Sequence, residues 1–532
     1  MHAQYLFTNC TIIDGTGSPS WVGEVAVGEG RILALAPDLS SVQAGERIDG
    51  RLRVLCPGFI DIHGHSDLEV LRRPAMLPKL NQGITTEVAG NCGQGVFPCH
   101  SESTQCKLEA LVRDVLGPYP LPWNWHDLST YLAQVSDQGS GTNLLFLQAH
   151  APLRLSAMEG NPNRPATVRE RDIMVALLEQ SFAQGALGFS SGLYYAPCLF
   201  ASSDEFEALL QVTARHDRLF AVHHRCEGNE VLESLREVLD LAERTGVRIE
   251  LSHLKAIGRK NQDKVPRMLE LIEAYHSRGV RVTFDQYPYE YGSTSLANLL
   301  PPSLLKLDRP QLLEVLSSTA RRREVRAEME APQGWDSIFE LCGWEDIRIV
   351  SLDTNPKYNG LDFPTIAAMR HQDPFDSFFD LVAEERGAAL MVDITQTQQS
   401  LESIMRHPLG CFSTDALYSG SGGHPRSWQA ARHLLDTYQR QKAVLPLPQQ
   451  IRRMTGEPAA RLGLCERGLI REGYAADLVL LDKDRMVDAS SLACPDAAGG
   501  GIDLVMVNGE VAYRDGVPTG VLGGQLLMLR NG

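Results

Sequence analysis

The sequence predicts an α/β fold, namely a TIM-like (β/α)8 barrel with a small β-sandwich built from both chain termini and an insertion after strand 7. Three observations predict it. Apolar runs of strand length alternate with amphipathic helical stretches in the middle of the chain, which is typical of parallel βα units. Short alternating strands with tight turns occupy both ends. The chain of 532 residues is also too long for one small core.

Eight apolar runs in the middle of the chain have the length of buried strands. They are Phe59–His63, Thr85–Ala89, Asn143–Gln148, Ala186–Ser190, Leu219–His223, Arg248–Ser252, Arg281–Gln286 and Gly410–Thr414. Stretches with apolar residues at three- and four-residue spacing lie between them, including Val168–Gln184, Asp204–His216, Glu230–Thr245 and Lys264–Arg278. Eight such units favour a closed barrel, whose chemistry lies at the C-terminal ends of the strands.

The two chain ends carry matching β patterns. Strands are expected at Leu6–Ile13, Glu24–Val27 and Arg31–Leu35, and again at Ala476–Asp482 and Leu504–Val511. We therefore expect residues 1–57 and 465–532 to form one small β-sandwich domain and residues 58–464 to form the barrel domain. The stretch at about 293–394 is too long for one crossover, so we interpret it as an insertion and consider a lid as its role.

Composition limits the kinds of partner. Lys+Arg 50 against Asp+Glu 66 gives a net charge of -16, which disfavours nucleic acid and anionic membranes and favours a small-molecule ligand. The N-terminal stretch lacks a targeting pattern and no apolar run reaches membrane-spanning length, so we expect a cytoplasmic protein. The 11 cysteines contain no Cys-x-x-Cys pair, which argues against a disulfide framework.

The first barrel strand leads into two histidines. Pro57 and Gly58 precede an apolar run that ends in His63-Gly64-His65. Residues i and i+2 of a strand face the same side, so both imidazoles can meet one metal ion. Taken alone, this pair is equally well explained as two hydrogen-bonded surface histidines.

The ends of four other strands carry further metal-ligand types. Cys92 follows strand two, His223 ends strand five, His253 follows strand six and Asp415 follows strand eight. Each has an ordinary structural explanation by itself: a buried thiol, hydrogen-bonded core imidazoles and a helix cap. All of them fall at the face where such barrels place their chemistry, and this joint occurrence predicts a metal site.

These residues carry a family resemblance. The run Pro57 to His65, the strand-end histidines and Asp415 resemble the amidohydrolase superfamily, as does the run Gly468 to Leu478, which returns the chain to the terminal sandwich. Within it the chain looks most like the D-aminoacylase (N-acyl-D-amino-acid deacylase) family. The narrower match lies in Gly185–Tyr195, His223-His224-Arg225, Ser252-His253-Leu254-Lys255 and Gly423-His424-Pro425-Arg426.

The resemblance implies a zinc site and a general base. A tight site would use Cys92, His223 and His253, and a weaker second site would use His63, His65 and Asp415. Whether one or two Zn2+ ions bind stays open. Asp415 would also act as the general base that takes a proton from water and gives it to the leaving amine.

The resemblance also implies residues for the substrate carboxylate. Lys255 resembles the family's carboxylate-binding lysine and Tyr195 matches the family tyrosine after strand four. Tyr287, Tyr289 and Ser293 follow strand seven and are further candidates. Their ordinary alternatives are a solvated lysine and half-buried aromatic rings.

We therefore expect a metal-dependent amide hydrolase that deacylates N-acyl-D-amino acids or a related N-acylated compound. A cyclic-amide hydrolase of the hydantoinase type is the first alternative, disfavoured because no lysine lies between Lys107 and Lys255 where those enzymes carry a carboxylated lysine. A non-catalytic binding protein is the second. The enlarged segments at 99–125 and 293–394 leave the side-chain and acyl preferences open, and a homo-oligomer is equally open.

Overall fold

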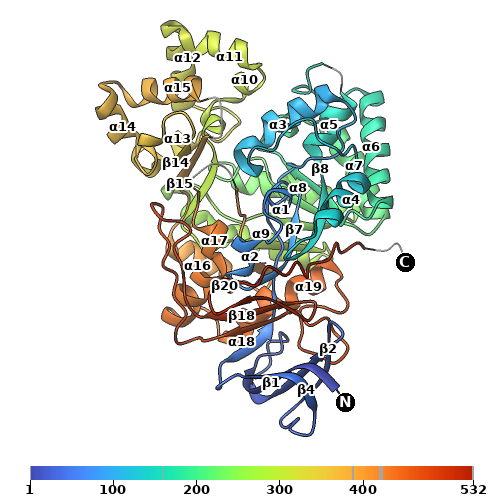
Figure 1. Ribbon diagram of the computed structural model, residues 1–532. Coiled ribbons are helices and arrows are strands. Elements are labelled where there is room, and N and C mark those ends of the chain that lie inside the picture. Colours follow the sequence, from blue (N-terminus) through green and yellow to red (C-terminus); the bar gives the residue numbers. More distant parts are fainter. Residues whose placement is uncertain (1, 159, 386–388, 419–422, 530–532) are drawn as a thin grey trace.

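The computed structural model describes residues 2–158, 160–385, 389–418 and 423–529. Figure 1 shows the barrel, a sheet formed below it by the blue and red ends of the chain, and a separate yellow group of helices at the upper left. Residues 386–388 of the predicted insertion and residues 530–532 of the predicted C-terminal part lie outside the described ranges.

The predicted barrel is confirmed. Eight parallel strands pair in the order β16-β12-β11-β10-β9-β8-β7-β6, which is the chain order read backwards. They are β6 (Phe59–Asp61), β7 (Ile84–Ala89), β8 (Asn143–Ala149), β9 (Gly188–Gly192), β10 (Leu219–His223), β11 (Arg248–Leu251), β12 (Val282–Gln286) and β16 (Gly410–Phe412). Each matches one predicted run, and only the strand ends differ.

The first and last strands meet just beyond their C-terminal ends. Gly64 and Ala416 form an isolated parallel bridge. The Asp415 backbone N–H donates to the His63 carbonyl at 2.8 Å. This seam closes the barrel beside the predicted ligands, so the ends of β6 and β16 are held together where the chemistry is expected.

Amphipathic helices cover the barrel as predicted. They are α6 (Val168–Ala183), α7 (Ser203–Arg215), α8 (Val231–Thr245) and α9 (Val265–Ser277). In α8 the buried residues recur at three- and four-residue spacing, including Leu235, Val238 and Ala242. Thr167 and Glu170 form a capping box that begins α6, because each side chain accepts a hydrogen bond from the other's backbone N–H.

Both ends of the chain join in one sheet, as expected, while the domain bounds 1–57 and 465–532 stay a prediction. The order is β20-β19-β18-β17-β5-β1-β2-β3, with β4 paired to β1, and the antiparallel β5–β17 pair connects the two ends. The strands are β1 (His2–Ile12), β2 (Trp21–Gly28), β3 (Arg31–Ala36), β4 (Gln43–Asp49), β5 (Val54–Pro57), β17 (Leu478–Leu481), β18 (Ile502–Val507), β19 (Glu510–Arg514) and β20 (Val517–Pro518).

The insertion after strand seven has its own core. Its three-stranded antiparallel sheet consists of β13 (Tyr291–Ser295), β14 (Ile347–Leu352) and β15 (Ala389–Ile394). Its helices are α10 (Pro302–Leu305), α11 (Arg309–Ser317), α12 (Thr319–Glu330), α13 (Ile338–Cys342), α14 (Phe363–Arg370) and α15 (Pro374–Glu384). Trp344 packs among Phe339, Phe363 and Phe375, so the insertion folds around an aromatic centre.

The second enlarged segment supports the base of this insertion. In α3 (Glu102–Leu116), the Asp114 carboxylate accepts from the Ser295 hydroxyl and from the Ala389 backbone N–H, the latter at 3.3 Å. Trp123 and Trp125 stack with their ring centroids 5.0 Å apart and are buried. The segment therefore connects the barrel to both β13 and β15.

The remaining helices complete the layers around the barrel. They are α1 (Glu69–Arg72), α2 (Leu77–Leu80), α4 (Leu128–Gln138), α5 (His150–Ala157), α16 (Gln398–Arg406), α17 (Arg426–His433), α18 (Leu447–Met454) and α19 (Gly456–Leu462). Among the described residues, we find no helix whose length and hydropathy would let it cross a membrane.

Candidate metal centre

The predicted ligands lie at the C-terminal ends of five barrel strands. His63 and His65 follow β6, and Cys92 follows β7. His223 is the last residue of β10, His253 follows β11 and Asp415 follows β16. All six side chains are buried. The parallel order of the strands brings them to one face, as the sequence predicts.

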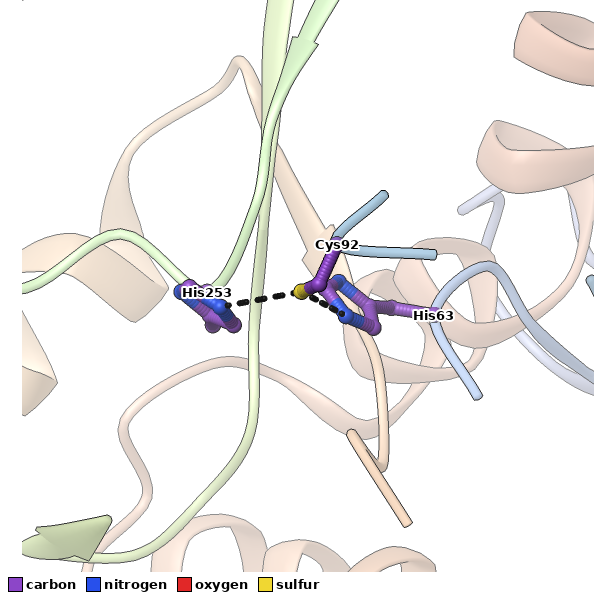
Figure 2. Close-up of side chains that lie close together, drawn as sticks. All are labelled: His63, Cys92 and His253. Carbon is purple, nitrogen blue, oxygen red and sulfur yellow. Dashed lines mark hydrogen bonds between the residues drawn. The ribbon is translucent and has the colours of Figure 1, made fainter. Parts of the chain in front are cut away.

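Cys92 lies between two of the histidines, as Figure 2 shows. Its sulfur is 3.3 Å from His63 Nε2 and 3.6 Å from His253 Nε2. His223 adjoins this group, with its Nδ1 2.9 Å from His253 Nε2. Cys92, His63 and His253 offer ligand atoms that all lie within 4.8 Å of one another.

Asp415 closes the second group. Its Oδ1 lies 3.2 Å from His65 Nε2 and 3.5 Å from His63 Nε2. His63 is therefore common to both groups, and the two predicted sites adjoin. The division into a tight site with Cys92, His223 and His253 and a weaker site with His63, His65 and Asp415 stays a prediction.

The backbone is left-handed at three of the six predicted ligands. The φ angles are 53° at Cys92, 36° at His253 and 49° at Asp415. A residue with a side chain seldom adopts this conformation, and such residues gather at functional sites when the surrounding fold compensates for the strain. The loops after β7, β11 and β16 are thus bent to direct these three side chains to one point.

The buried carboxylate of Asp285 orients two of the histidines, His63 and His253. Asp285, in β12, places Oδ2 3.1 Å from His63 Nδ1. Its Oδ1 accepts from the His253 backbone N–H at 3.0 Å and from the Ser413 hydroxyl at 2.6 Å. This leaves His63 Nε2 facing Cys92 and Asp415. A carboxylate behind an imidazole is the usual support of a metal-binding histidine.

The electrostatics favour anionic ligands. Burial raises the pKa of Cys92, but His63, His223 and His253 outweigh it and hold that pKa well below its usual range. Burial likewise raises the pKa of Asp415, and the nearby Arg426 and His63 outweigh it. Arg426 Nη1 lies 3.0 Å from Asp415 Oδ2. A thiolate and a carboxylate among imidazoles are what a borderline cation such as zinc requires.

The close packing of the ligand atoms also fits a bound metal ion. Buried polar side chains normally have hydrogen-bond partners, yet these imidazoles and the thiol are packed with their ligand atoms facing one another. His65 Nδ1 is buried and has no hydrogen-bond partner among the described residues. A cation among these ligand atoms would receive the lone pairs that otherwise face each other.

A cavity opens beside this centre. His223, His253 and Asp415 line it together with four of the five residues predicted to bind substrate, which are Lys255, Tyr195, Tyr287 and Ser293. Lys255 Nζ lies 6.0 Å from the centroid of the Tyr287 ring. The Arg426 Cζ atom lies 4.7 Å from the same centroid. The Tyr287 hydroxyl has no hydrogen-bond partner among the described residues.

Tyr289 does not line this cavity. Its backbone N–H donates to the Tyr287 carbonyl at 3.1 Å, so a tight turn through Pro288 separates the two rings. The Tyr289 ring stacks on His433 with the centroids 4.5 Å apart. Proximity in the sequence suggested a shared role, whereas the turn directs the two tyrosines differently.

Other motif residues have structural surroundings. His150 Nε2 lies 2.9 Å from Glu205 Oε1, and Arg154 pairs with the same carboxylate. His424 Nε2 lies 3.0 Å from the Tyr291 carbonyl at the start of the insertion. Arg426, by contrast, contacts Asp415 directly.

Several residues of the site escaped the sequence reasoning. Glu227 places Oε1 2.8 Å from Lys255 Nζ and 3.2 Å from His253 Nδ1. Its position four residues after His223 was the available signal. Asp285 is the residue before the last in the predicted strand Arg281–Gln286. Asp336 and Asp393 line the cavity from the insertion, and no local pattern in the sequence indicated them.

The barrel and this donor set together define a metal-dependent barrel protein. The chain matches the model of the amidohydrolase family over residues 46–513, and it belongs to that family. The prediction of an amidohydrolase is thereby confirmed, and relatives that include D-aminoacylases and N-acyl-D-amino-acid deacylases confirm the narrower resemblance.

Three similar proteins place the chain further. It is 32% identical to the N-acyl-D-aspartate deacylase of Alcaligenes xylosoxydans xylosoxydans, over 97% of this chain and 93% of that protein. The zinc and phosphonate-inhibitor complex of Bordetella bronchiseptica N-acyl-D-glutamate deacylase shares 30% identity, with a TM-score of 0.84 and coverage of 99% and 100%. A D-aminoacylase with a binuclear metal centre shares 29% identity at a TM-score of 0.82, with coverage of 99% and 100%.

Proposed function

We propose that this protein is a zinc-dependent deacylase that hydrolyses the amide bond of N-acyl-D-amino acids. The observation that carries the proposal is the position of Cys92 among His63 and His253, beside a cavity that also presents Lys255. The relatives named as N-acyl-D-amino-acid deacylases, matched over nearly the full chain, support it. A metal held by this centre would polarise the amide carbonyl and lower the pKa of water.

The amino-acid carboxylate would be held by polar residues that line the cavity. Lys255 supplies the fixed positive charge, and the hydroxyls of Tyr195 and Tyr287 supply donors. Ser293 also lines the cavity, but its hydroxyl donates to the Met391 carbonyl at 2.8 Å. These groups orient the scissile amide toward the metal ligands. Such orientation lowers the barrier because the reacting groups are already in place.

Asp415 would serve as the general base. It is ionised because Arg426 lies 3.0 Å from its Oδ2, and its Oδ1 faces the histidines. The carboxylate takes the proton from the attacking water and then passes it to the amide nitrogen. An amine leaves poorly without that proton, so bond cleavage requires the second transfer as well.

The test is amine release from a panel of N-acetyl-D- and N-acetyl-L-amino acids by the zinc-reconstituted protein. We expect release from D-configured members and little from their L-enantiomers. Cleavage of cyclic imides without action on linear amides would instead favour the hydantoinase alternative. Absence of turnover with zinc demonstrably bound would contradict the deacylase proposal.

A further inference from the structure

The cavity beside the metal centre is lined by more acids than bases. Its charged lining consists of four carboxylates, from Glu227, Asp336, Asp393 and Asp415, and two cations, from Lys255 and Arg426. A substrate that brings its own carboxylate would add to this negative charge. The partners of each acid therefore decide what kind of side chain the substrate can carry.

Three of the four carboxylates are satisfied within the protein. Glu227 pairs with Lys255 at 2.8 Å and Asp415 pairs with Arg426 at 3.0 Å. Asp336 accepts hydrogen bonds from the backbone N–H groups of residues 227, 228 and 229 at 2.6, 2.7 and 3.2 Å. These three carboxylates need no cationic group from a substrate.

Asp393 is different. It is 3% exposed and lies on β15 opposite Gly292 of β13. Within the described part of the chain, the only side-chain donor to its carboxylate is the Cys342 thiol, 3.9 Å from Oδ2, and no cation lies within ion-pair distance. A thiol is a weak donor, so the carboxylate is nearly without a partner.

An unpaired buried carboxylate is costly to maintain. Burial raises the pKa of Asp393 to about 6, although Lys255 and Arg426 lower it. A buried charge of this kind is normally paired. Because the carboxylate lines the cavity, a cationic group of a bound ligand could provide the missing partner.

The carboxylate lies beside the expected position of the amino acid. A Cβ at Gly292 would stand 3.3 Å from the Tyr287 hydroxyl and 3.4 Å from Asp393 Oδ1. Because both oxygens lie close to the same point beside Gly292, the unpaired acid is a near neighbour of a hydroxyl expected to bind the substrate carboxylate, and both residues line the cavity. A linear side chain could extend from one toward the other.

We propose that the substrate is an N-acyl-D-amino acid with a cationic side chain, an ammonium or guanidinium group, which pairs with Asp393. This inference rests on the proposed deacylase function and specifies its substrate class. It separates this protein from the relatives named for N-acyl-D-aspartate and N-acyl-D-glutamate. A second substrate carboxylate would face Asp393 as a like charge, which is unfavourable in a buried site.

The first test compares three substrates with the zinc-loaded protein. Nα-acetyl-D-lysine and N-acetyl-D-norleucine differ only in the terminal ammonium, and N-acetyl-D-glutamate supplies the opposite charge. We expect kcat/KM for the lysine derivative to exceed that for norleucine by about 30-fold or more, the lower bound for a buried charge pair. The glutamate derivative should be the poorest of the three.

The second test removes the charge. Asp393→Asn should lower kcat/KM for Nα-acetyl-D-lysine by about 30-fold, so that the ratio of kcat/KM for Nα-acetyl-D-lysine to that for N-acetyl-D-norleucine falls toward one. Asp376→Asn is the matched control, because it makes the same charge change at a side chain that is 52% exposed in the insertion. This control should leave both values unchanged, and zinc content should be equal in all three proteins.

The outcomes separate the two proposals. Equal or better hydrolysis of norleucine or glutamate would overturn the cationic-substrate inference and leave the deacylase function standing. An Asp393→Asn variant that keeps the preference for lysine would overturn it too. Failure to hydrolyse any of the D-amides would contradict the deacylase function itself.

Discussion

At the scale of single residues, Cys92 is distinctive because its thiol is surrounded by imidazoles. Cys99 is buried as well, but its surroundings differ. It donates its S–H to the Trp125 carbonyl at 3.2 Å, and burial raises the pKa of its thiol to about 12. The same residue type therefore has two different roles within eight positions of the chain.

This contrast gives a paired prediction. Cys92→Ala should reduce bound zinc, with an affinity loss of at least about 10-fold because an anionic ligand is removed. Cys99→Ala should keep full zinc content. The measurement is metal stoichiometry after gel filtration, and a Cys92→Ala protein with wild-type zinc and activity would refute the ligand role.

Asp415 is predicted to act differently from a purely structural ligand. Asp415→Asn keeps the shape and the contact with Arg426 but removes the basic oxygen. We expect zinc to remain at the Cys92 group while kcat falls by roughly 10²- to 10⁴-fold, the usual contribution of a positioned base. The measurement is single-turnover kinetics beside metal analysis. Residual activity near wild type would exclude Asp415 as the general base.

At the scale of elements, a buried lysine holds three barrel segments together. Lys79, on α2, places Nζ 2.6 Å from Asp61 of β6 and 3.2 Å from Glu87 of β7. It also donates to the Thr414 hydroxyl, after β16, at 3.0 Å. All three charged side chains are fully buried. The lysine thus joins the two sides of the barrel seam next to the metal centre, because Asp61 and Thr414 closely precede the ligands His63 and Asp415.

Removal of this lysine should destabilise the barrel strongly. Lys79→Met leaves two buried carboxylates without a cation, and the loss of one partner of a buried ion pair costs about 3–5 kcal/mol. The measurement is the urea midpoint of unfolding. Lys107→Met changes an exposed lysine and should have little effect. A Lys79→Met midpoint equal to that of the control would contradict this account.

At the scale of the whole molecule, the metal centre lies across the barrel seam. His63 follows the first strand and Asp415 follows the last, and a single isolated bridge joins these ends. Cys92, His223 and His253 add the ends of three further strands. A bound metal would therefore connect segments from both edges of the eight-stranded sheet.

Removal of the metal should destabilise the barrel most at this seam. A ligand present at 100 times its Kd stabilises the folded state by about 2.7 kcal/mol, so chelation should lower Tm by a few degrees. Amide hydrogen exchange should rise at residues 62–66 and 413–417 more than in β9, which lies within the sheet. Restoring zinc should reverse both changes. Uniform exchange across the barrel would argue against a seam-bridging metal.

The sequence by itself determined the order of the barrel strands and the chemistry at their ends. Apolar runs and helical periodicity are local properties, and in a parallel barrel every strand end reaches the same face. His63, Cys92, His253 and Asp415 could therefore be assigned to one site before any distance was known. The family resemblance then added Lys255.

The tertiary structure alone decided which side chains meet inside the cavity. Glu227 pairs with Lys255, and Asp393 reaches the site from an insertion whose packing no local pattern describes. Tyr289 turns away from the cavity because the chain bends after Tyr287. Such contacts depend on long-range packing and on the direction of each side chain. The spacing of residues along the chain predicts neither property.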